Sequence, residues 1–123
     1  MPVYRVLCVE DDEDTRDMLE TRLGLSDFEA VVAPDMGAAL RLMERERFDL
    51  YVLDGGLRGD NGLSLCEQIR VLDSHTPIII FSGHAFESDI EAGMRAGANA
   101  YLVKPDSSQL IPTIKRLLAA AAE

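Results

Sequence analysis

The chain has 123 residues, of which 47% are hydrophobic and 28% are charged, so it is long and apolar enough to form one hydrophobic core. We therefore expect a single globular domain over residues 1–123 and exclude an intrinsically disordered chain. The 22 acidic and 12 basic residues give a net charge of -10, which argues against direct nucleic-acid binding because phosphate backbones are bound by an excess of Lys and Arg.

Short apolar runs alternate with longer stretches of helical periodicity. The runs are rich in Val, Ile, Leu or aromatic residues and are too short for core helices, so they predict strands. In chain order the predicted strands cover residues 3–9, 28–33, 50–53, 77–81 and 100–103.

Between these strands, apolar residues recur three or four positions apart, which predicts helices with one apolar face. The residues on these faces are Met18, Leu19 and Leu23; Ala39, Leu42 and Met43; Leu65, Ile69 and Leu72; Ile90 and Met94; and Leu110, Ile111, Ile114, Leu117 and Leu118. Asp35 can cap the second helix and Gly97 can close the fourth. Asp106 or Ser107 can start the fifth. Five strand–helix units predict an α/β fold, a doubly wound parallel sheet with helices on both faces.

Two cysteines and the N-terminus exclude further classes of protein. Cys8 and Cys66 lie in apolar runs far apart in the sequence, so we interpret them as buried thiols and not as a disulfide or metal ligands. The N-terminus lacks the apolar stretch of a signal peptide, and no apolar run approaches membrane-spanning length. We expect a cytoplasmic location and no membrane partner.

Polar residues follow four of the five predicted strands. Glu10 and Asp11 follow the first strand, Asp54 the third, Ser82 the fourth and Lys104 the fifth. All strands of a parallel sheet point the same way, so these residues meet at one edge, where open α/β folds bind ligands. The second strand ends without such a residue, as expected for a strand that lies outside the ligand-binding crevice at this edge.

Three carboxylates at one sheet edge repel one another, so their negative charge needs to be compensated. At a separation of ~4 Å and an effective dielectric near 20, each like-charge pair costs about 4 kcal/mol. Either some of the carboxyl groups are protonated or a cation lies among them. A hard divalent ion such as Mg²⁺ suits oxygen ligands, and the absence of His and Cys from these strand ends argues against zinc.

Lys104 and Ser82 add an ammonium and a hydroxyl, which together with a carboxylate-bound Mg²⁺ suit a phosphoryl group. Asp54 is the natural nucleophile because it directly follows a buried strand at the centre of the site. Gly55 and Gly56 leave room for a substrate beside it. Carboxylates form aspartyl phosphates, in which the protein mainly positions groups and neutralises charge.

From about residue 4 to residue 118 the chain closely resembles the receiver domain of two-component response regulators. The matching stretches are VLCVED at 6–11, LYVLD at 50–54, IIIFSG at 78–83 and GANAYLVKP at 97–105, together with Gly62 eight residues after Asp54. These motifs occur in the family's order and spacing. The resemblance implies the flavodoxin-like strand order 2-1-3-4-5.

The resemblance also implies roles in phosphorylation. Asp54 is the expected phosphoacceptor, Ser82 the hydroxyl that contacts the phosphoryl group, Lys104 the family's lysine, and Tyr101 the aromatic switch residue. Ser82 and Tyr101 are expected to move inward on phosphorylation. The Lys104–Pro105 bond is typically cis in the family.

Mg²⁺ is the cofactor that the resemblance implies. Asp11 is the expected direct ligand, Glu10 holds a metal-bound water, and Gly56 supplies its backbone carbonyl. Asp54 is also expected to belong to the metal site.

The implied partners are a sensor histidine kinase or a phosphotransfer protein as donor, and a downstream effector protein or a fused output domain as target. The face built from the fourth helix, the fifth strand and the fifth helix is expected to change shape on phosphorylation and can also form a homodimer. The expected domain is not an enzyme beyond catalysing its own phosphorylation and dephosphorylation.

Several positions depart from the family pattern. Arg58 stands where many members have Pro, so we expect a mobile loop over residues 55–61. Gly83 replaces the usual Ala, and Asp106 stands where Phe is common. His84, together with Gly56, occupies a variable position that tunes the lifetime of the aspartyl phosphate in the family.

Other interpretations stay open at this point. The acids at 12–14 suit a solvated helix N-terminus, where they interact favourably with the helix dipole. Taken alone, Lys104 could be a solvated lysine, Tyr101 an edge-of-core residue, and His75 a surface residue. The function could also be that of a phosphorylation-independent interaction module or a Mg²⁺-dependent phosphatase. The phosphatase generally needs a second acid two residues beyond the nucleophile, where Gly56 stands.

Overall fold

The structure is a computed structural model that describes residues 3–56 and 62–122. In these two ranges, strands and helices alternate five times along the chain. The elements are β1 (Arg5–Val9), α1 (Glu13–Leu25), β2 (Glu29–Ala33), α2 (Met36–Arg45), β3 (Leu50–Asp54), α3 (Gly62–Leu72), β4 (Ile78–Ser82), α4 (Glu87–Arg95), β5 (Ala100–Val103) and α5 (Leu110–Ala121).

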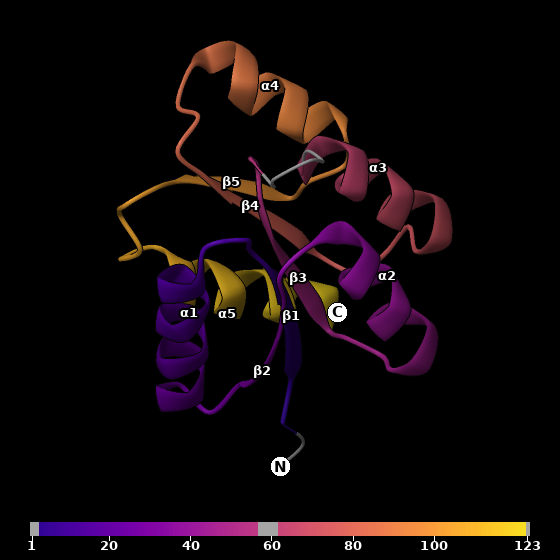
Figure 1. Ribbon diagram of the computed structural model, residues 1–123, viewed down its shortest axis with the longest axis vertical. Helices are drawn as coiled ribbons and strands as arrows, with labels where there is room; N and C mark the ends of the chain where they lie inside the picture. The colour runs from indigo at the N-terminus through magenta and orange to yellow at the C-terminus, as the bar shows by residue number, and fades with distance from the viewer. Residues whose placement is uncertain (1–2, 57–61, 123) are drawn as a thin grey trace.

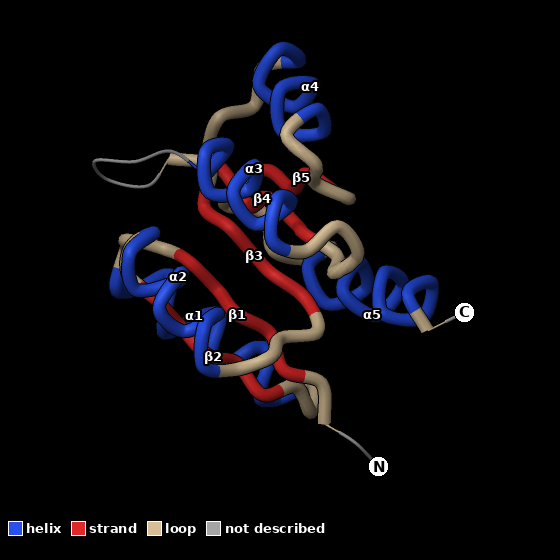
Figure 2. Tube along the Cα trace, turned by 90° about the vertical axis from the view of Figure 1, so that its right-hand side faces the viewer, coloured by secondary structure: helices blue, strands red, loops and turns tan. Residues whose placement is uncertain are grey.

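The five strands form one parallel sheet in the order β2-β1-β3-β4-β5, which confirms the predicted fold and strand order. Figure 2 shows β3 running through the middle of the sheet. Two strands reach one residue further than predicted, to Asp54 and Ser82. Asp54 pairs with Phe81, and Ser82 pairs with Val103, so the sheet itself positions both polar residues.

The central strands are buried on both faces, and their side chains alternate between two cores. One core holds Val52 and Phe81 against Leu19 of α1 and Ile114 of α5. The other holds Leu53 and its neighbours against the apolar faces of α2 and α3. Figure 1 shows α1 and α5 on one side of the sheet and α2 and α3 on the other.

Two of the expected helix ends are confirmed and one is wrong. The Asp35 carboxylate accepts a hydrogen bond from the Ala38 amide at 2.8 Å, which caps α2. Gly97 follows α4 with a φ of 116°, a left-handed conformation that favours glycine. Neither Asp106 nor Ser107 caps α5, which begins at Leu110. The Asp106 carboxylate instead accepts from the amide and hydroxyl of Ser108, so it stabilises a turn before the helix.

Two residues assigned to apolar helix faces are exposed. Leu72, the last residue of α3, is 70% exposed, and Met94 in the last turn of α4 is 43% exposed. Periodicity shows which residues share a side of a helix, but it does not show how far along the helix the sheet covers that side.

Cys8 and Cys66 are both buried free thiols, as predicted. Burial raises the pKa of Cys8 to about 12 and that of Cys66 to about 11, so both stay protonated at neutral pH. Among the described residues, no helix is long and apolar enough to cross a membrane.

Candidate functional site

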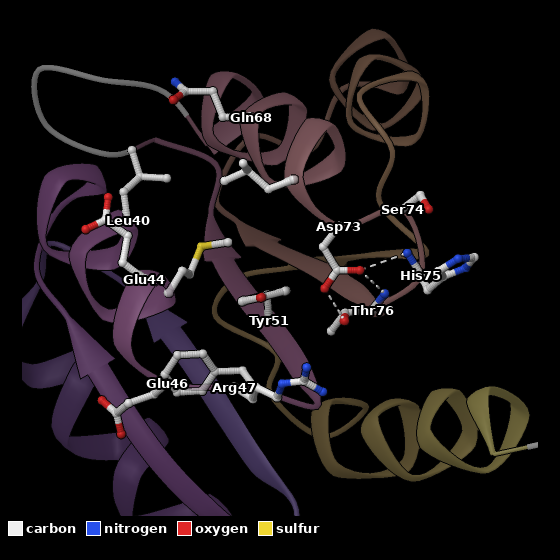
Figure 3. A pocket seen from close by; sticks show the side chains of 13 residues that line it. Leu40, Glu44, Glu46, Arg47, Tyr51, Gln68, Asp73, Ser74, His75 and Thr76 are labelled. Atoms are coloured by element: carbon white, nitrogen blue, oxygen red, sulfur yellow. Dashed lines mark hydrogen bonds between the residues drawn. The ribbon is translucent and has the colours of Figure 1, made fainter.

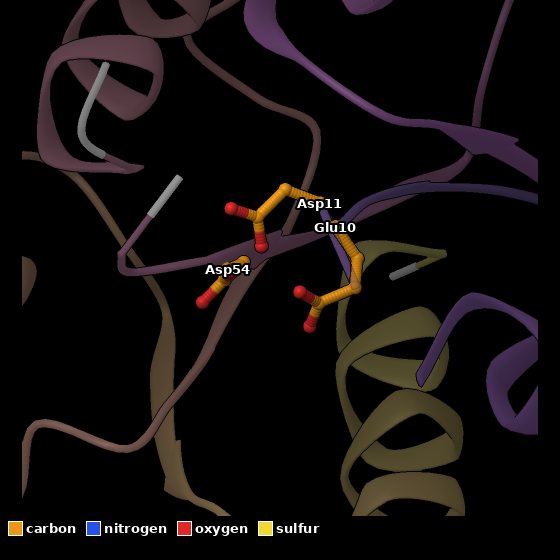
Figure 4. A group of neighbouring side chains, drawn as sticks. All are labelled: Glu10, Asp11 and Asp54. Atoms are coloured by element: carbon orange, nitrogen blue, oxygen red, sulfur yellow. The ribbon is translucent and has the colours of Figure 1, made fainter. Parts of the chain in front are cut away.

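The sheet brings the three predicted carboxylates together. Glu10 and Asp11 directly follow β1, and Asp54 is the last residue of the adjacent strand β3. One carboxylate oxygen from each residue lies within 4.8 Å of the other two. Figure 4 shows the three side chains turned toward a common space. Glu10 and Asp54 are buried, at 2% and 7% exposure, while Asp11 is half-buried.

Lys104 lies against this cluster from the end of β5. Its ammonium nitrogen is 2.5 Å from Glu10 Oε1 and 3.2 Å from Asp54 Oδ1. The Lys104 amide donates to the Ser82 carbonyl at 2.8 Å, which anchors the backbone of the lysine to β4. The bond to Pro105 is cis, as expected. Lys104 is therefore an ion-paired member of the site and not a solvated surface lysine.

Ser82 completes the group from the end of β4. The residue has no exposed surface, and its hydroxyl oxygen accepts a hydrogen bond from the His84 amide at 3.1 Å. The Asp54 Oδ1 atom accepts from the Gly56 amide at 3.1 Å, which holds the carboxylate in place. The carbonyl role expected of Gly56 stays a prediction.

Tyr101, on the edge strand β5, is half-buried. Its hydroxyl donates to the His84 carbonyl at 2.6 Å, two residues beyond Ser82. Its ring packs on Gly93 of α4, where a Cβ atom would lie only 2.8 Å from the ring carbon Cδ2. Tyr101 thus connects the end of β4 to α4, although its role as a switch stays a prediction.

The two buried carboxyl groups, Glu10 and Asp54, differ in the direction of their pKa shifts. Burial, followed by the hydrogen bond with Asp54, raises the pKa of Glu10 to about 7, although Lys104 acts in the opposite direction. Burial also tends to raise the pKa of Asp54, but hydrogen bonds involving Glu10, Gly56 and Lys104 lower it below its ordinary value. Below about pH 7, Glu10 therefore carries the proton that the pair shares, and Asp54 is the anion.

This raised pKa predicts how the stability of the metal-free protein depends on pH. A carboxyl group with a folded-state pKa near 7 and an unfolded value near 4.5 stabilises the fold fully below pH 4.5, and this contribution is lost as the pH rises through 7. The lowered pKa of Asp54 contributes no change between pH 5 and 8. We expect the Glu10 contribution to the free energy of unfolding to fall over that range by at most about 3 kcal/mol.

The substitution Glu10→Gln should remove this fall, because the amide does not titrate. Urea unfolding of both proteins at pH 5 and pH 8, in the presence of a chelator, measures the difference. The substitution Glu20→Gln, on the exposed side of α1, is the matched control and should keep the wild-type pH dependence. An equal fall in wild type and Glu10→Gln would contradict this assignment of the proton.

The acidic residues at 12–14 have structural roles, which agrees with the interpretation that they suit a solvated helix N-terminus. Asp12 is the N-cap of α1, and its exposed carboxylate accepts from the amide and hydroxyl of Thr15. Glu13 and Asp14 lie exposed in the first turn. His75 is also exposed, as that interpretation proposed.

Sequence reasoning missed Arg16, whose Nη1 atom donates to the Glu10 carbonyl at 2.9 Å and fixes the backbone at the start of the site. No motif marks this contact, because it joins a helical side chain to a main-chain atom. Among the departures from the family pattern, Gly83 and Asp106 are exposed. Arg58 and the mobility expected of the loop lie outside the described residues.

A groove of about 880 Å³ lies between α2 and α3, away from this cluster (Figure 3). Its lining includes Tyr51 at the start of β3, Leu72 at the end of α3 and His75 in the following loop. None of the strand-end carboxylates contributes to it. The groove therefore plays no part in chemistry at Asp54.

A five-stranded parallel sheet in the order 2-1-3-4-5, with an acidic, lysine-containing cluster at its carboxyl edge, places the chain among flavodoxin-like α/β domains with an acidic site able to hold a metal ion. The family model described as the response regulator receiver domain matches residues 6–115. The chain belongs to this family of two-component signalling domains. As a receiver domain it is not a conventional enzyme.

Known proteins with similar sequences include transcriptional regulatory proteins. The chain is 39% identical over 115 residues to the transcriptional regulatory protein PrrA of Mycobacterium tuberculosis. The matched segment covers 93% of this chain and 49% of that protein. It is 37% identical over 106 residues to the uncharacterized transcriptional regulatory protein YrkP of Bacillus subtilis, covering 86% and 45%. The chain thus spans about half the length of these curated relatives.

Solved structures agree with the fold. A CheY-like receiver domain protein from Methanospirillum hungatei superposes with a TM-score of 0.92 at 29% identity and covers 98% of both chains. TrrA of Thermotoga maritima, solved in complex with Mg²⁺–BeF, superposes with a TM-score of 0.84 at 27% identity and covers 94% of this chain and 99% of that one.

Proposed function

We propose that this domain, residues 1–123, accepts a phosphoryl group on Asp54 from a histidine kinase or a phosphotransfer protein, in a Mg²⁺-dependent reaction. The observation that carries the proposal is the contact of the Asp54 carboxylate with Lys104 inside the three-carboxylate cluster. The family supports the reaction, because phosphorylation on Asp and dependence on Mg²⁺ are typical of receiver domains.

The donor set fits Mg²⁺. The carboxylate oxygens of Glu10, Asp11 and Asp54 are hard ligands, and one atom from each can reach a shared ion. Bound there, Mg²⁺ would neutralise charge on the carboxylates and on the transferred phosphoryl oxygens. TrrA, whose structure was solved with Mg²⁺–BeF, supports the same assignment by similarity.

In the proposed reaction, a carboxylate oxygen of Asp54 forms a bond to phosphorus while the bond from phosphorus to the donor atom breaks. The lowered pKa of Asp54 keeps this oxygen unprotonated and nucleophilic. Lys104, which forms an ion pair with Asp54, would bind a phosphoryl oxygen in place of that carboxylate oxygen. Ser82 offers a hydroxyl to a second phosphoryl oxygen.

The proposed output is a change in the face formed by α4, β5 and α5. Tyr101 supports this route, because its hydroxyl bonds the backbone beyond Ser82 and its ring packs on α4. We propose that a fused output domain or a separate effector protein reads the face, that two copies of the chain can pair through it, and that the protein works in the cytoplasm. The similarity to two transcriptional regulators supports DNA binding by an output domain, with no direct nucleic-acid contact by this receiver.

Two features of the site disfavour the alternative functions, an interaction module and a phosphatase. A phosphorylation-independent interaction module would not need the complete set of acidic, lysine and serine residues at the sheet edge. A phosphatase of the aspartyl type would need a second acid where Gly56 stands, so we expect no turnover of small phosphate esters.

The test is incubation of the protein with acetyl phosphate, followed by intact mass spectrometry. With Mg²⁺ present we expect the gain of one phosphoryl group, and with a chelator we expect none. If the mass stays unchanged with Mg²⁺, the proposed function is wrong.

A further inference from the structure

Gly55, the residue directly after Asp54, lies against the side chain of Ser82. A Cβ atom built on Gly55 would lie 2.5 Å from Ser82 Oγ and 2.7 Å from Ser82 Cβ. Both distances are well below van der Waals contact, since carbon atoms in contact lie ≈ 3.5–4.0 Å apart. The serine side chain therefore occupies the space that any side chain at position 55 would need.

Ser82 cannot give way by turning its hydroxyl alone, because the overlap includes its Cβ atom. The residue is completely buried at the end of β4, and its backbone carbonyl accepts from the Lys104 amide at 2.8 Å. A larger residue at position 55 would thus force either the end of β4 or the backbone after Asp54 to move.

We propose that Gly55 is a positioning residue for Ser82. Because Gly55 has no side chain, the Ser82 side chain has the space it needs for its hydroxyl to lie beside the phosphoacceptor. This inference rests on the proposed phosphorylation of Asp54. In the reaction, Ser82 donates a hydrogen bond to the charged phosphoryl group, so displacing it removes one donor from the transition state. Gly55 itself makes no contact with the phosphoryl group through a side chain.

Gly62 provides a contrast in the same part of the fold. A Cβ atom there would lie 2.1 Å from the Asp54 carbonyl oxygen and 2.9 Å from Gly55 Cα, so a side chain at position 62 would displace the backbone of the phosphoacceptor and of Gly55 together. Removing the Ser82 side chain would not relieve this backbone overlap, so Gly62→Ala should slow phosphorylation in both backgrounds. The effect of Gly55→Ala should instead depend on the residue at position 82.

The experiment compares four proteins: wild type, Gly55→Ala, Ser82→Gly and the double variant. Phosphorylation by acetyl phosphate with Mg²⁺ is followed by intact mass spectrometry, and Mg²⁺ affinity by isothermal titration. We expect Gly55→Ala to slow phosphorylation about tenfold when Ser82 is present and to cause no further slowing in the Ser82→Gly background, where the space is free. The Mg²⁺ affinity of Gly55→Ala should stay within about twofold of wild type, because the carboxylate ligands keep their places.

Gly83→Ala is the matched control, since a Cβ atom at that exposed neighbour of Ser82 meets nothing within 4 Å. We expect wild-type phosphorylation from it. An equal loss from Gly55→Ala in both backgrounds, or a matching loss of Mg²⁺ affinity, would overturn the inference. If Gly55→Ala does not fold, the double variant decides: a folded double variant supports the inference, and an unfolded one overturns it. Failure of the wild type to be phosphorylated would instead overturn the proposed function.

Discussion

Asp54→Asn should abolish the phosphoryl gain completely under conditions that convert a large part of the wild type. The amide has no negative charge and no nucleophilic oxygen pair, so it cannot replace the carboxylate that attacks phosphorus. It is nearly the same size as Asp, and it can still accept from the Gly56 amide as Asp54 does at 3.1 Å. The site should therefore stay folded while its chemistry is lost. Intact mass spectrometry after incubation with acetyl phosphate and Mg²⁺ measures the result.

Two further variants separate the acceptor from its neighbours. Asp11→Asn keeps the acceptor but removes a metal ligand, so we expect slow phosphorylation that higher Mg²⁺ concentrations partly restore. Asp17→Asn, at an exposed position on α1, should behave as the wild type. A phosphoryl gain on Asp54→Asn equal to that of the wild type would place the acceptor on another residue.

The strand ends explain why so much of the site could be predicted. Asp54 and Ser82 each follow a run of apolar residues that is buried on both faces of a parallel sheet, so the sheet direction alone brings them to one edge. Glu10 and Lys104 were predicted to join them by the same logic, and both do. The apolar runs carry this information because they set, to within one residue, where each strand ends.

Contacts between arginine side chains and backbone carbonyls could not be predicted in this way. Arg70 of α3 donates to the carbonyls of Gly97, Asp73 and Thr76, and Arg16 donates to that of Glu10. A main-chain acceptor leaves no residue-type signal in a sequence. Gly55 was interpreted as room for a substrate, whereas the structure shows the Ser82 side chain in that space, because the sequence does not show which side chain of a neighbouring strand faces a glycine. The start of α5 was misplaced because the carboxylate of Asp106 can cap a short turn as well as a helix.

Lys104→Met should slow phosphorylation but strengthen Mg²⁺ binding, so it separates the two properties. The ammonium group lies 2.5 Å from Glu10 and 3.2 Å from Asp54, so in the metal-free protein it offsets charge on the carboxylates that would bind Mg²⁺. Methionine keeps a similar length without the charge. Loss of the cation from the transition state should slow phosphorylation by about 10²–10³-fold, as for other preorganised donors. Mg²⁺ should bind about tenfold more tightly, because a competing positive charge is gone.

The same substitution should destabilise the metal-free protein and leave the Mg²⁺-bound protein nearly as stable as wild type. Removing one partner of a buried ion pair costs about 3–5 kcal/mol, and we expect about 2 kcal/mol at pH 8 because the Lys104 side chain is 23% exposed and Glu10 can take up a proton. Urea unfolding with and without Mg²⁺, together with isothermal titration, measures both effects. Lys104→Arg keeps the charge and is the matched control, so its Mg²⁺ affinity should stay close to wild type. Weaker Mg²⁺ binding by Lys104→Met would show that the lysine orders the carboxylates for the metal instead of competing with it.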